Sequence, residues 1–505
     1  MSLRVASSIV ADSGSPTFVL ISLLAVCLSS LGIGYGDMLD DAFIHLRYAD
    51  NLLSGGTFEY NRGEPSYGTS SPLFVLLLAA FRWMPVDYQL PKLLSTAGWT
   101  VLLAWIFLLS RKHEGWLRVA LIALAFCVAS PFGHRWLASG METSLVALWS
   151  FATALLCAQL LRVREGAPGT LPLAALAVCS ALLRIELPVL ATILALMVAI
   201  QAYRAGTSLR PAAAAVAGLA AGLVLIWLMF GRIVPDAAVA KSGDASIHAA
   251  VTGLPHALIV TITGHLAASL FGVILSLLVV IFFIWSLRAL NGSKRLIMLG
   301  LYALYPLLVM GIAARHQSVQ GLRYFLFLDF FLIVVSAQVI AHETPRHARN
   351  LEEKLKRAPW MRTTSILGLT AWMLFDVTLY QGVAASRAET YRALRAMDLH
   401  SYRDRPCIGQ DIGAFGYFSQ CRVFDLAGLV NGRSRAELSG DARYASGANV
   451  EPELAFLNES QLTLLSGAGL DLDSWIVLSR LDIPNVLRSD IHVLLAKPET
   501  PALPE

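Results

Sequence analysis

Long apolar runs fill most of the chain up to residue 384, and short polar connections separate them. A helix that crosses a bilayer needs about 20 apolar residues, with a range of about 17 to 25. About eleven runs reach or approach this length, and they predict a mainly α, polytopic membrane protein. They lie at roughly 17–35, 91–110, 117–133, 142–161, 168–183, 185–203, 211–230, 266–287, 295–314, 322–341 and 363–384.

Composition agrees with a membrane location. Of the 505 residues, 56% are hydrophobic and 15% are charged, whereas a soluble domain carries about 25% charged residues. The net charge of +4 is scattered, and no basic patch is interleaved with aromatic residues, which excludes a nucleic-acid partner. The first apolar run is too long for a signal-peptide core and lacks a small-residue cleavage site after it, so it predicts a retained helix.

The run at 72–84 sets the predicted topology. With about 13 residues it is too short to cross the bilayer. Counting it as a span would also place the basic connections outside, against the excess of Lys and Arg in cytoplasmic loops. We therefore expect a re-entrant or surface-lying helix at 72–84. The N-terminus and the basic loop 342–362 are then cytoplasmic, and the C-terminus is external.

Two adjacent carboxylates, Asp40 and Asp41, closely follow the first apolar run, at the start of the predicted external loop 36–90. They lie at the membrane surface, where an ionised group is costly unless it is solvated or paired. Carboxylates in such a place are a functional hypothesis by default. Because a carboxylate can take the proton of an attacking hydroxyl, Asp40 and Asp41 are the candidate catalytic residues.

Further charged residues are predicted on the same side of the membrane. Arg184 and Glu186 occupy the turn between two short spans, and Glu142 lies at a second such junction, so we expect two recessed polar turns around a cavity. Lys241 and Arg323 lie in two later connections. These cations could hold a phosphate. Two simpler interpretations stay open: Arg184 pairs with Glu186 or Glu142, and interfacial Lys and Arg extend to lipid headgroups.

The apolar pattern ends near residue 385, and the remaining 385–505 predict a soluble α/β domain. The stretch RPCIGQDIGAFGYFSQCRVFDLAGLVNG is typical of strand, Gly-rich turn, short helix and strand. Its glycines, Gly409, Gly413 and Gly416, favour tight turns over a phosphate-binding loop. Cys407 and Cys421 are near neighbours in the predicted external compartment and are a candidate disulfide. Metal-ligand spacing is absent, so we predict no metal ligands and no required cofactor, while a divalent ion held by carboxylates near a phosphate stays open as an alternative.

The stretch DDAFIHLRYADNLLSGGTFEYNRGEPSYGTSSPLF resembles the first external loop of membrane-embedded C-type (GT-C) glycosyltransferases. Within that group it is most similar to bacterial arabinofuranosyltransferases that use decaprenyl-phosphate arabinose. Four more segments keep the order found there: SGMETSLVAL, ALLRIELPVL, GRIVPDAAVAKSG and QDIGAFGYFSQCRVFDLAGLVN. The resemblance implies a transmembrane glycosyltransferase module at 1–384 and an active site and C-terminal domain on the periplasmic or external side of the bacterial inner membrane.

The resemblance also implies an activity. A sugar, with arabinofuranose the best choice, passes with inversion from a polyprenyl-phosphate donor to an envelope glycan, a glycolipid or a protein acceptor. Asp40 aligns with the first acidic position of the loop motif and is the expected general base, and Asp41 aligns with the second. The residues expected to contact the donor phosphate or sugar are Arg47, Tyr48, Glu142, Arg184, Glu186, Lys241 and Arg323.

Two other classes of protein remain as alternatives. A transporter or flippase for lipid-linked sugars would line both membrane halves with polar residues or show repeated broken helices, whereas here the polar residues gather on one side. A non-catalytic envelope assembly protein of the same fold would tolerate loss of the carboxylates, and this chain keeps both.

Overall fold

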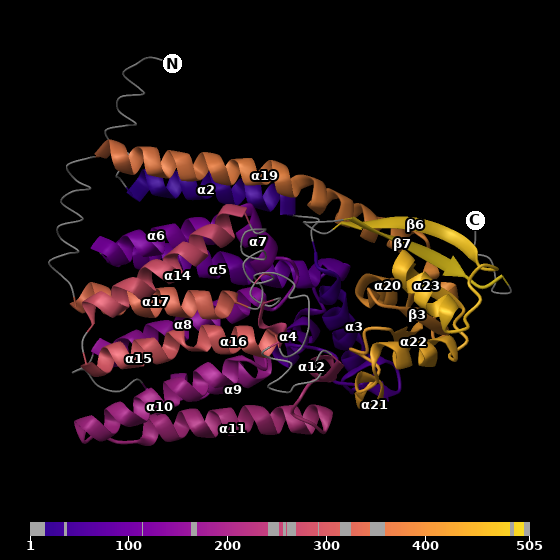
Figure 1. The fold of residues 1–505 in the computed structure, drawn as a ribbon, viewed down its shortest axis with the longest axis horizontal. Coiled ribbons are helices and arrows are strands. Elements are labelled where there is room, and N and C mark those ends of the chain that lie inside the picture. The colour runs from indigo at the N-terminus through magenta and orange to yellow at the C-terminus, as the bar shows by residue number, and fades with distance from the viewer. Residues whose placement is uncertain are drawn as a thin grey trace, which may run out of the picture.

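The computed structural model describes residues 16–34, 38–113, 115–162, 169–240, 252–255, 259, 269–290, 292–313, 325–343, 359–484 and 489–498. Within them the chain forms a helical module and a smaller module built around a five-stranded sheet (Figure 1). The long helices run alongside one another, and α3 (Asp40–Gly55), α4 (Pro72–Phe81) and α12 (Asp236–Ala240) lie at the end nearest the sheet.

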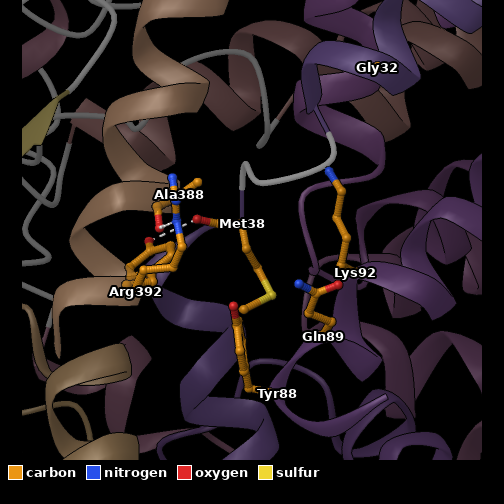
Figure 2. Close-up of a pocket in the computed structure, with 8 residues that line it drawn as sticks. Gly32, Met38, Tyr88, Gln89, Lys92, Ala388 and Arg392 are labelled. Carbon is orange, nitrogen blue, oxygen red and sulfur yellow. Dashed lines mark hydrogen bonds between the residues drawn. The ribbon is translucent and has the colours of Figure 1, made fainter. Parts of the chain in front are cut away.

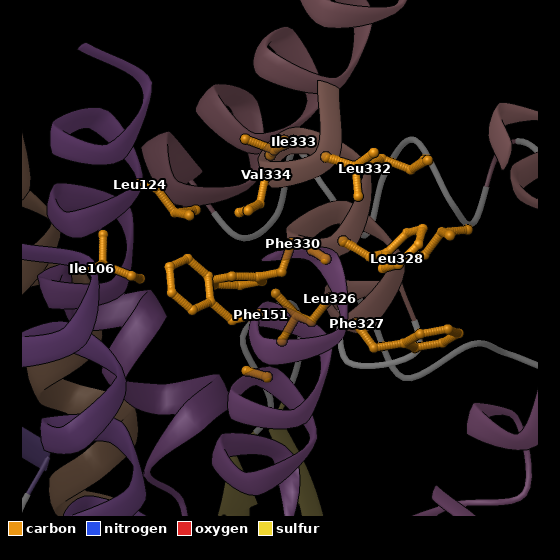
Figure 3. Packing of buried hydrophobic residues seen from close by; sticks show 14 of the residues in the cluster. Ile106, Leu124, Phe151, Leu326, Phe327, Leu328, Phe330, Leu332, Ile333 and Val334 are labelled. Atoms are coloured by element: carbon orange, nitrogen blue, oxygen red, sulfur yellow. The ribbon is translucent and has the colours of Figure 1, made fainter. Parts of the chain in front are cut away.

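The other helices of the helical module are mostly long and apolar. They are α2 (Pro16–Gly34), α5 (Leu90–Lys112), α6 (Gly115–Ala129), α7 (Pro131–Leu137), α8 (Thr143–Arg162), α9 (Thr170–Leu183), α10 (Leu187–Ala205), α11 (Arg210–Phe230), α14 (Ser269–Ala289), α15 (Gly292–Tyr302), α16 (Leu304–Ala313), α17 (Leu326–Glu343) and α19 (Pro359–Ala396). Their core is apolar: Figure 3 shows Phe330 of α17 among Phe151 of α8, Leu124 of α6 and Ile106 of α5.

Four helices of the described ranges are long and apolar enough to cross a membrane, at Asp87–Lys112, Thr143–Leu160, Leu187–Ala205 and Arg210–Phe230. A fifth span is present if α6 and α7, which meet at an angle of 75°, are counted together. Shorter apolar helices accompany them, including the ten-residue α4 at the predicted non-spanning run. The chain is therefore a mainly helical membrane protein, and the count of about eleven spans stays a prediction.

Two of the predicted spans are broken, and proline accounts for both breaks. In the run 117–133, α6 ends at Ala129 and α7 begins at Pro131, where Ser130 caps the new helix by accepting a hydrogen bond from Gly133 N at 3.0 Å. In the run 295–314, α15 ends at Tyr302, four residues before Pro306. Proline has no N–H for the carbonyl four residues back, which weakens the helix there.

The sheet has the strand order β4-β3-β5-β7-β6, with β3 parallel to β4 and β5 and the remaining pairs antiparallel. Cys407 in β3 and Cys421, just before β4, form a disulfide. The elements of this sheet module are β3 (Pro406–Gly409), α20 (Ile412–Ser419), β4 (Arg422–Asp425), α21 (Arg433–Ala436), α22 (Gly440–Ala448), β5 (Leu454–Asn458), α23 (Glu459–Gly467), β6 (Ile476–Pro484) and β7 (Ser489–Ala496).

The predicted domain boundary at residue 385 falls inside α19, a helix of 38 residues that reaches from the helical module to β6 (Figure 1). Apolar residues stop near 384, but the following segment AASRAETYRALRA is rich in strong helix formers, so the helix continues past the apolar run. The two modules are further joined by a common apolar core in which Phe43 and Leu46 of α3 share one cluster with Phe415 and Val423 of the sheet module.

Candidate active site

The start of α3 is held from two sides. Leu39 N donates a hydrogen bond to Ser139 O at 2.9 Å, and the Tyr391 hydroxyl of α19 donates to Met38 O at 2.8 Å. The segment before α8 and the long helix α19 therefore fix the chain ahead of Asp40. The first turn of α3, which carries Asp40 and Asp41, is directed at the N-terminus of α20 in the sheet module.

The Asp40 carboxylate caps α20 with both oxygens. Its Oδ2 accepts a hydrogen bond from Gly413 N at 2.6 Å, and its Oδ1 accepts one from Ala414 N at 2.8 Å. Amide groups in the first turn of a helix have no partner within the helix and favour a negative charge. A Cβ atom on Gly413 would overlap the backbone oxygen of Asp40, so this close approach requires glycine.

The surroundings of Asp40 raise its pKa. Burial of the carboxyl, followed by the nearby charge of Asp411, raises the pKa of Asp40 to about 7, against the opposing effect of the two amide hydrogen bonds. Asp41, the next residue of α3, contributes in the same direction. The Asp411 carboxylate in turn contacts His492, whose Nε2 lies 2.7 Å from Asp411 Oδ2. Asp40 is thus poised to change its protonation state near neutral pH.

A second cluster of polar side chains lies where α3 meets the segments just before α8 and α10. His45 Nδ1 lies 2.8 Å from Thr69 Oγ1, and His45 Nε2 lies 3.5 Å from Glu142 Oε2. Arg184 Nη1 lies 3.6 Å from Glu142 Oε1, and the same guanidinium binds Glu186 through two nitrogens, at 2.7 and 3.3 Å. His45 and Glu142 are 2% and 1% exposed, so the contact between these two side chains lies out of reach of water.

The predicted recessed turns are therefore brought together, since Glu142 and Arg184 come from the two junctions and meet. These contacts agree with the simpler interpretation of Arg184, in which it pairs with Glu186 and Glu142. His45 was missed, although its position four residues after Asp41 places both on one face of α3 and was a usable signal. Among the residues described by the structure, no group of three or more His, Cys, Asp or Glu is arranged to hold a metal.

Arg47 and Tyr48 hold protein segments together. Arg47 donates to Gly416 O at 2.6 Å and to Cys421 O at 2.7 Å, and its guanidinium lies 4.2 Å from the centre of the Tyr60 ring. Tyr48 Oη lies 2.6 Å from Ser66 Oγ. These contacts fasten α20 and the segment after β2 (Glu64–Pro65) to α3. Their predicted contact with the donor stays a prediction.

Lys241 and Arg323 lie outside the described residues. The helix that ends just before Lys241, α12, contacts the first loop. Buried Asp236, the first residue of α12, accepts hydrogen bonds from Tyr67 N at 2.8 Å and from Arg232 Nη2 at 2.9 Å. Asp236 N in turn donates to Tyr67 O at 2.8 Å. The contact between Asp236 and Tyr67, which ties α12 to the first loop, was not predicted from the sequence.

The architecture of a helical membrane module with a small sheet module at one end is that of a GT-C fold. It matches the crystal structure of ArnT from Cupriavidus metallidurans bound to undecaprenyl phosphate, with a TM-score of 0.52 at 9% sequence identity, over 95% of this chain and 98% of that one. At this identity the likeness shows the fold. No known family profile and no curated protein sequence matches the chain.

Proposed function

We propose that the protein is a polyprenyl-phosphate-dependent glycosyltransferase with Asp40 as its general base. The observation that carries the proposal is the Asp40 carboxylate, held by two backbone amides and with a pKa raised to about 7. A general base works best when its pKa lies near the operating pH. The undecaprenyl phosphate bound to ArnT supports a lipid-linked phosphate as the donor for this fold.

In the proposed step the acceptor hydroxyl attacks the anomeric carbon of the donor sugar from the side opposite the phosphate. Asp40 takes the hydroxyl proton, the new glycosidic bond forms with inversion, and the bond from the sugar to the phosphate oxygen breaks, with its electron pair leaving on the phosphate. Each carboxylate oxygen has a second lone pair, so both amide contacts can persist while the proton arrives. Arg184, Lys241 and Arg323 are proposed to stabilise the leaving phosphate.

The finer parts of the proposal rest on the sequence resemblance. The sugar is arabinofuranose, and the acceptor is an envelope glycan, a glycolipid or a protein, reached at the external face of the bacterial inner membrane. The step requires no divalent ion. Purified protein in nanodiscs, supplied with decaprenyl-phosphate arabinose and an envelope glycan acceptor, should release decaprenyl phosphate. A flippase or an assembly protein would release none, with this or any other polyprenyl-phosphate sugar.

The proposed topology has about eleven spans, with the active site and the sheet module external. A reporter fused after Leu355, within the basic loop 342–362, should read cytoplasmic, because Lys and Arg retain a short loop inside. A reporter fused after Pro406 should read external. An external reading at Leu355, measured with paired alkaline phosphatase and fluorescent protein fusions, would contradict the scheme.

Transfer should depend on the ionisation of Asp40. With a pKa of about 7, the carboxylate is mostly protonated below neutral pH, so turnover should rise with pH through about 7 and level off above it. Asp411→Asn removes one of the charges that raise this pKa, so the rising limb should move to lower pH. Asp441→Asn, on the surface of α22, is the matched control and should leave the limb in place.

The measurement is the pH dependence of kcat in nanodiscs. The groups that face Asp40 are Asp411 and the amides of α20 from the sheet module, with Asp41 and Tyr60 from the first loop. If kcat rises over the same pH range in Asp411→Asn as in the unmodified protein, another group sets the pH dependence.

A further inference from the structure

The N-terminus of α20 is capped by a carboxylate from the other module, although the residue directly before the helix, Asp411, is itself an aspartate. An aspartate at this position ordinarily accepts a hydrogen bond from the second or third amide of the helix. In α20 these amides are Gly413 N and Ala414 N, and both donate to Asp40. Asp411 makes no capping hydrogen bond. Asp40 and Asp411 therefore compete for the same two donors.

The Asp411 side chain is held by β7 instead. Its Oδ2 lies 2.7 Å from His492 Nε2, and because a carboxylate only accepts hydrogen bonds, that nitrogen is the donor. The His492 side chain is 1% exposed, and its ring stacks on Phe456 of β5 with the ring centres 5.0 Å apart. His492 is thus fixed within the sheet module. The Asp411 side chain is 45% exposed and has room to turn once it is released.

The backbone of Asp411 is compatible with capping. Ser71, at the start of α4, has a ψ of 87°, close to the 78° of Asp411, and its hydroxyl accepts a hydrogen bond from Phe74 N at 3.4 Å. Phe74 N is the third amide of α4, the counterpart of Ala414 N in α20. What distinguishes Asp411 from this capping residue is its contact with His492.

The backbone before Asp40 is anchored to α19. The Tyr391 hydroxyl donates to Met38 O at 2.8 Å, and Met38 faces the same cavity as Ala388 of α19 (Figure 2). A Cβ on Gly413 would overlap the backbone oxygen of Asp40, so α20 already lies against the start of α3. With both backbones in place, a second carboxylate can reach the two amides only if the Asp40 side chain turns away.

We propose that His492 is a positioning residue for the transfer step: it holds the Asp411 carboxylate away from the N-terminus of α20 and so leaves both amides to Asp40. Without a hydrogen-bond donor at position 492, Asp411 should cap its own helix and displace the Asp40 side chain. The effect on transfer rests on the proposed function, because it acts through Asp40 as the base. The exchange of carboxylates at α20 does not depend on that function.

The test uses variants that remove the donor, keep a donor, or remove the competing carboxylate. His492→Phe keeps a ring against Phe456 but has no donor, whereas His492→Gln keeps an N–H. Asp411→Ala, alone and combined with His492→Phe, removes the competitor, and alanine is chosen because asparagine also caps helices. His400→Phe, at an exposed position before β3, is the matched control. If His492→Phe does not fold, His492→Leu, which also lacks a donor, takes its place.

The measurement is an infrared titration of the Asp40 carboxyl in the purified full-length protein in nanodiscs. The absorption of Asp40 is identified by its loss in Asp40→Asn. In His492→Phe the pKa of Asp40 should rise from about 7 by about one to two pH units, because the carboxylate loses two hydrogen bonds that favour its ionised form. The rising limb of kcat against pH should move with it. His492→Gln and His400→Phe should keep the titration of the unmodified protein.

The combined variant separates a positioning role from a structural one. Once Asp411→Ala has removed the competitor, His492→Phe should have no further effect, so the single Asp411→Ala and the combined variant should titrate alike. The other groups that face Asp40, Asp41 and Tyr60, are the same in all of these variants. An unchanged titration in His492→Phe, or an equal rise with and without Asp411, would overturn the proposal.

The titration needs no substrate, so its result is independent of the transfer assay. A protein that transfers no sugar, but in which His492→Phe raises the pKa of Asp40 only when Asp411 is present, would contradict the glycosyltransferase proposal and support the role of His492. A protein that transfers sugar and titrates alike with and without His492 would do the reverse.

Discussion

Replacement of Asp40 by Asn should lower the turnover number for sugar transfer by about 10²- to 10⁴-fold, the usual contribution of a general base. Asparagine keeps the size of the side chain and one oxygen for the amides of α20, but it cannot take the proton of the acceptor hydroxyl. The loss should therefore appear in kcat, with little change in the affinity for the donor. Single-turnover kinetics with a defined polyprenyl-phosphate sugar separate the two.

Asp50→Asn provides the matched control for this prediction. Asp50 lies on the same helix, α3, and its carboxylate pairs with Arg82 at 2.6 Å near the surface, away from α20. The same substitution there should leave turnover close to normal. Near-normal turnover in Asp40→Asn would show that Asp40 is not the base, and Asp41 or Glu142 would take its place as the candidate.

Gly413→Ala should also abolish most of the transfer, for a different reason. The added methyl group would overlap the backbone oxygen of Asp40, and backbone cannot move aside as a flexible side chain can. α20 must shift away from α3, which removes both amide hydrogen bonds from the Asp40 carboxylate. Overpacking of this kind destabilises a protein by about 1 to 3 kcal/mol, so the melting temperature should fall together with the activity.

Gly467→Ala is the control for the glycine substitution. Gly467 ends α23, and a Cβ there meets no atom within 4 Å. The activity of this variant should match that of the unmodified protein. Its melting temperature should be equal or slightly higher, since alanine restricts the unfolded chain more than glycine does. Wild-type activity and stability in Gly413→Ala would contradict the close contact between α20 and Asp40.

The helices were largely predictable because a membrane imposes length and polarity on each segment. α9 and α11 begin and end within about two residues of the predicted runs. The break before α7 could also have been found, since Ser130 followed by Pro131 is a helix start signal inside an apolar run. Hydropathy averages over such a signal, which is why the run was counted as one span.

The site was predictable in its residue types but not in its contacts. The position of Asp40 after an apolar span made it a candidate, whereas its partners in the structure are backbone amides, which every sequence contains. The spacing of Gly413 and Gly416 was interpreted as turns, and this was wrong: both lie within α20. Their shared property is that a Cβ on either glycine would meet α3: one on Gly413 would overlap the Asp40 backbone, and one on Gly416 would lie 2.9 Å from Arg47 Nη1. The need for glycine at such positions can be recognised only when the segment that packs against them is known.

The contact between Asp40 and α20 joins positions 373 residues apart. A ribosome adds about 5 to 20 residues per second, so roughly 20 to 75 s separate the synthesis of the carboxylate from that of the amides that hold it. During this interval the early helices can enter the membrane while the Asp40 carboxylate lacks the two amides that bind it. In a newly made chain the Asp40 carboxylate should therefore reach its capped state only when the sheet module has folded and docked against α3.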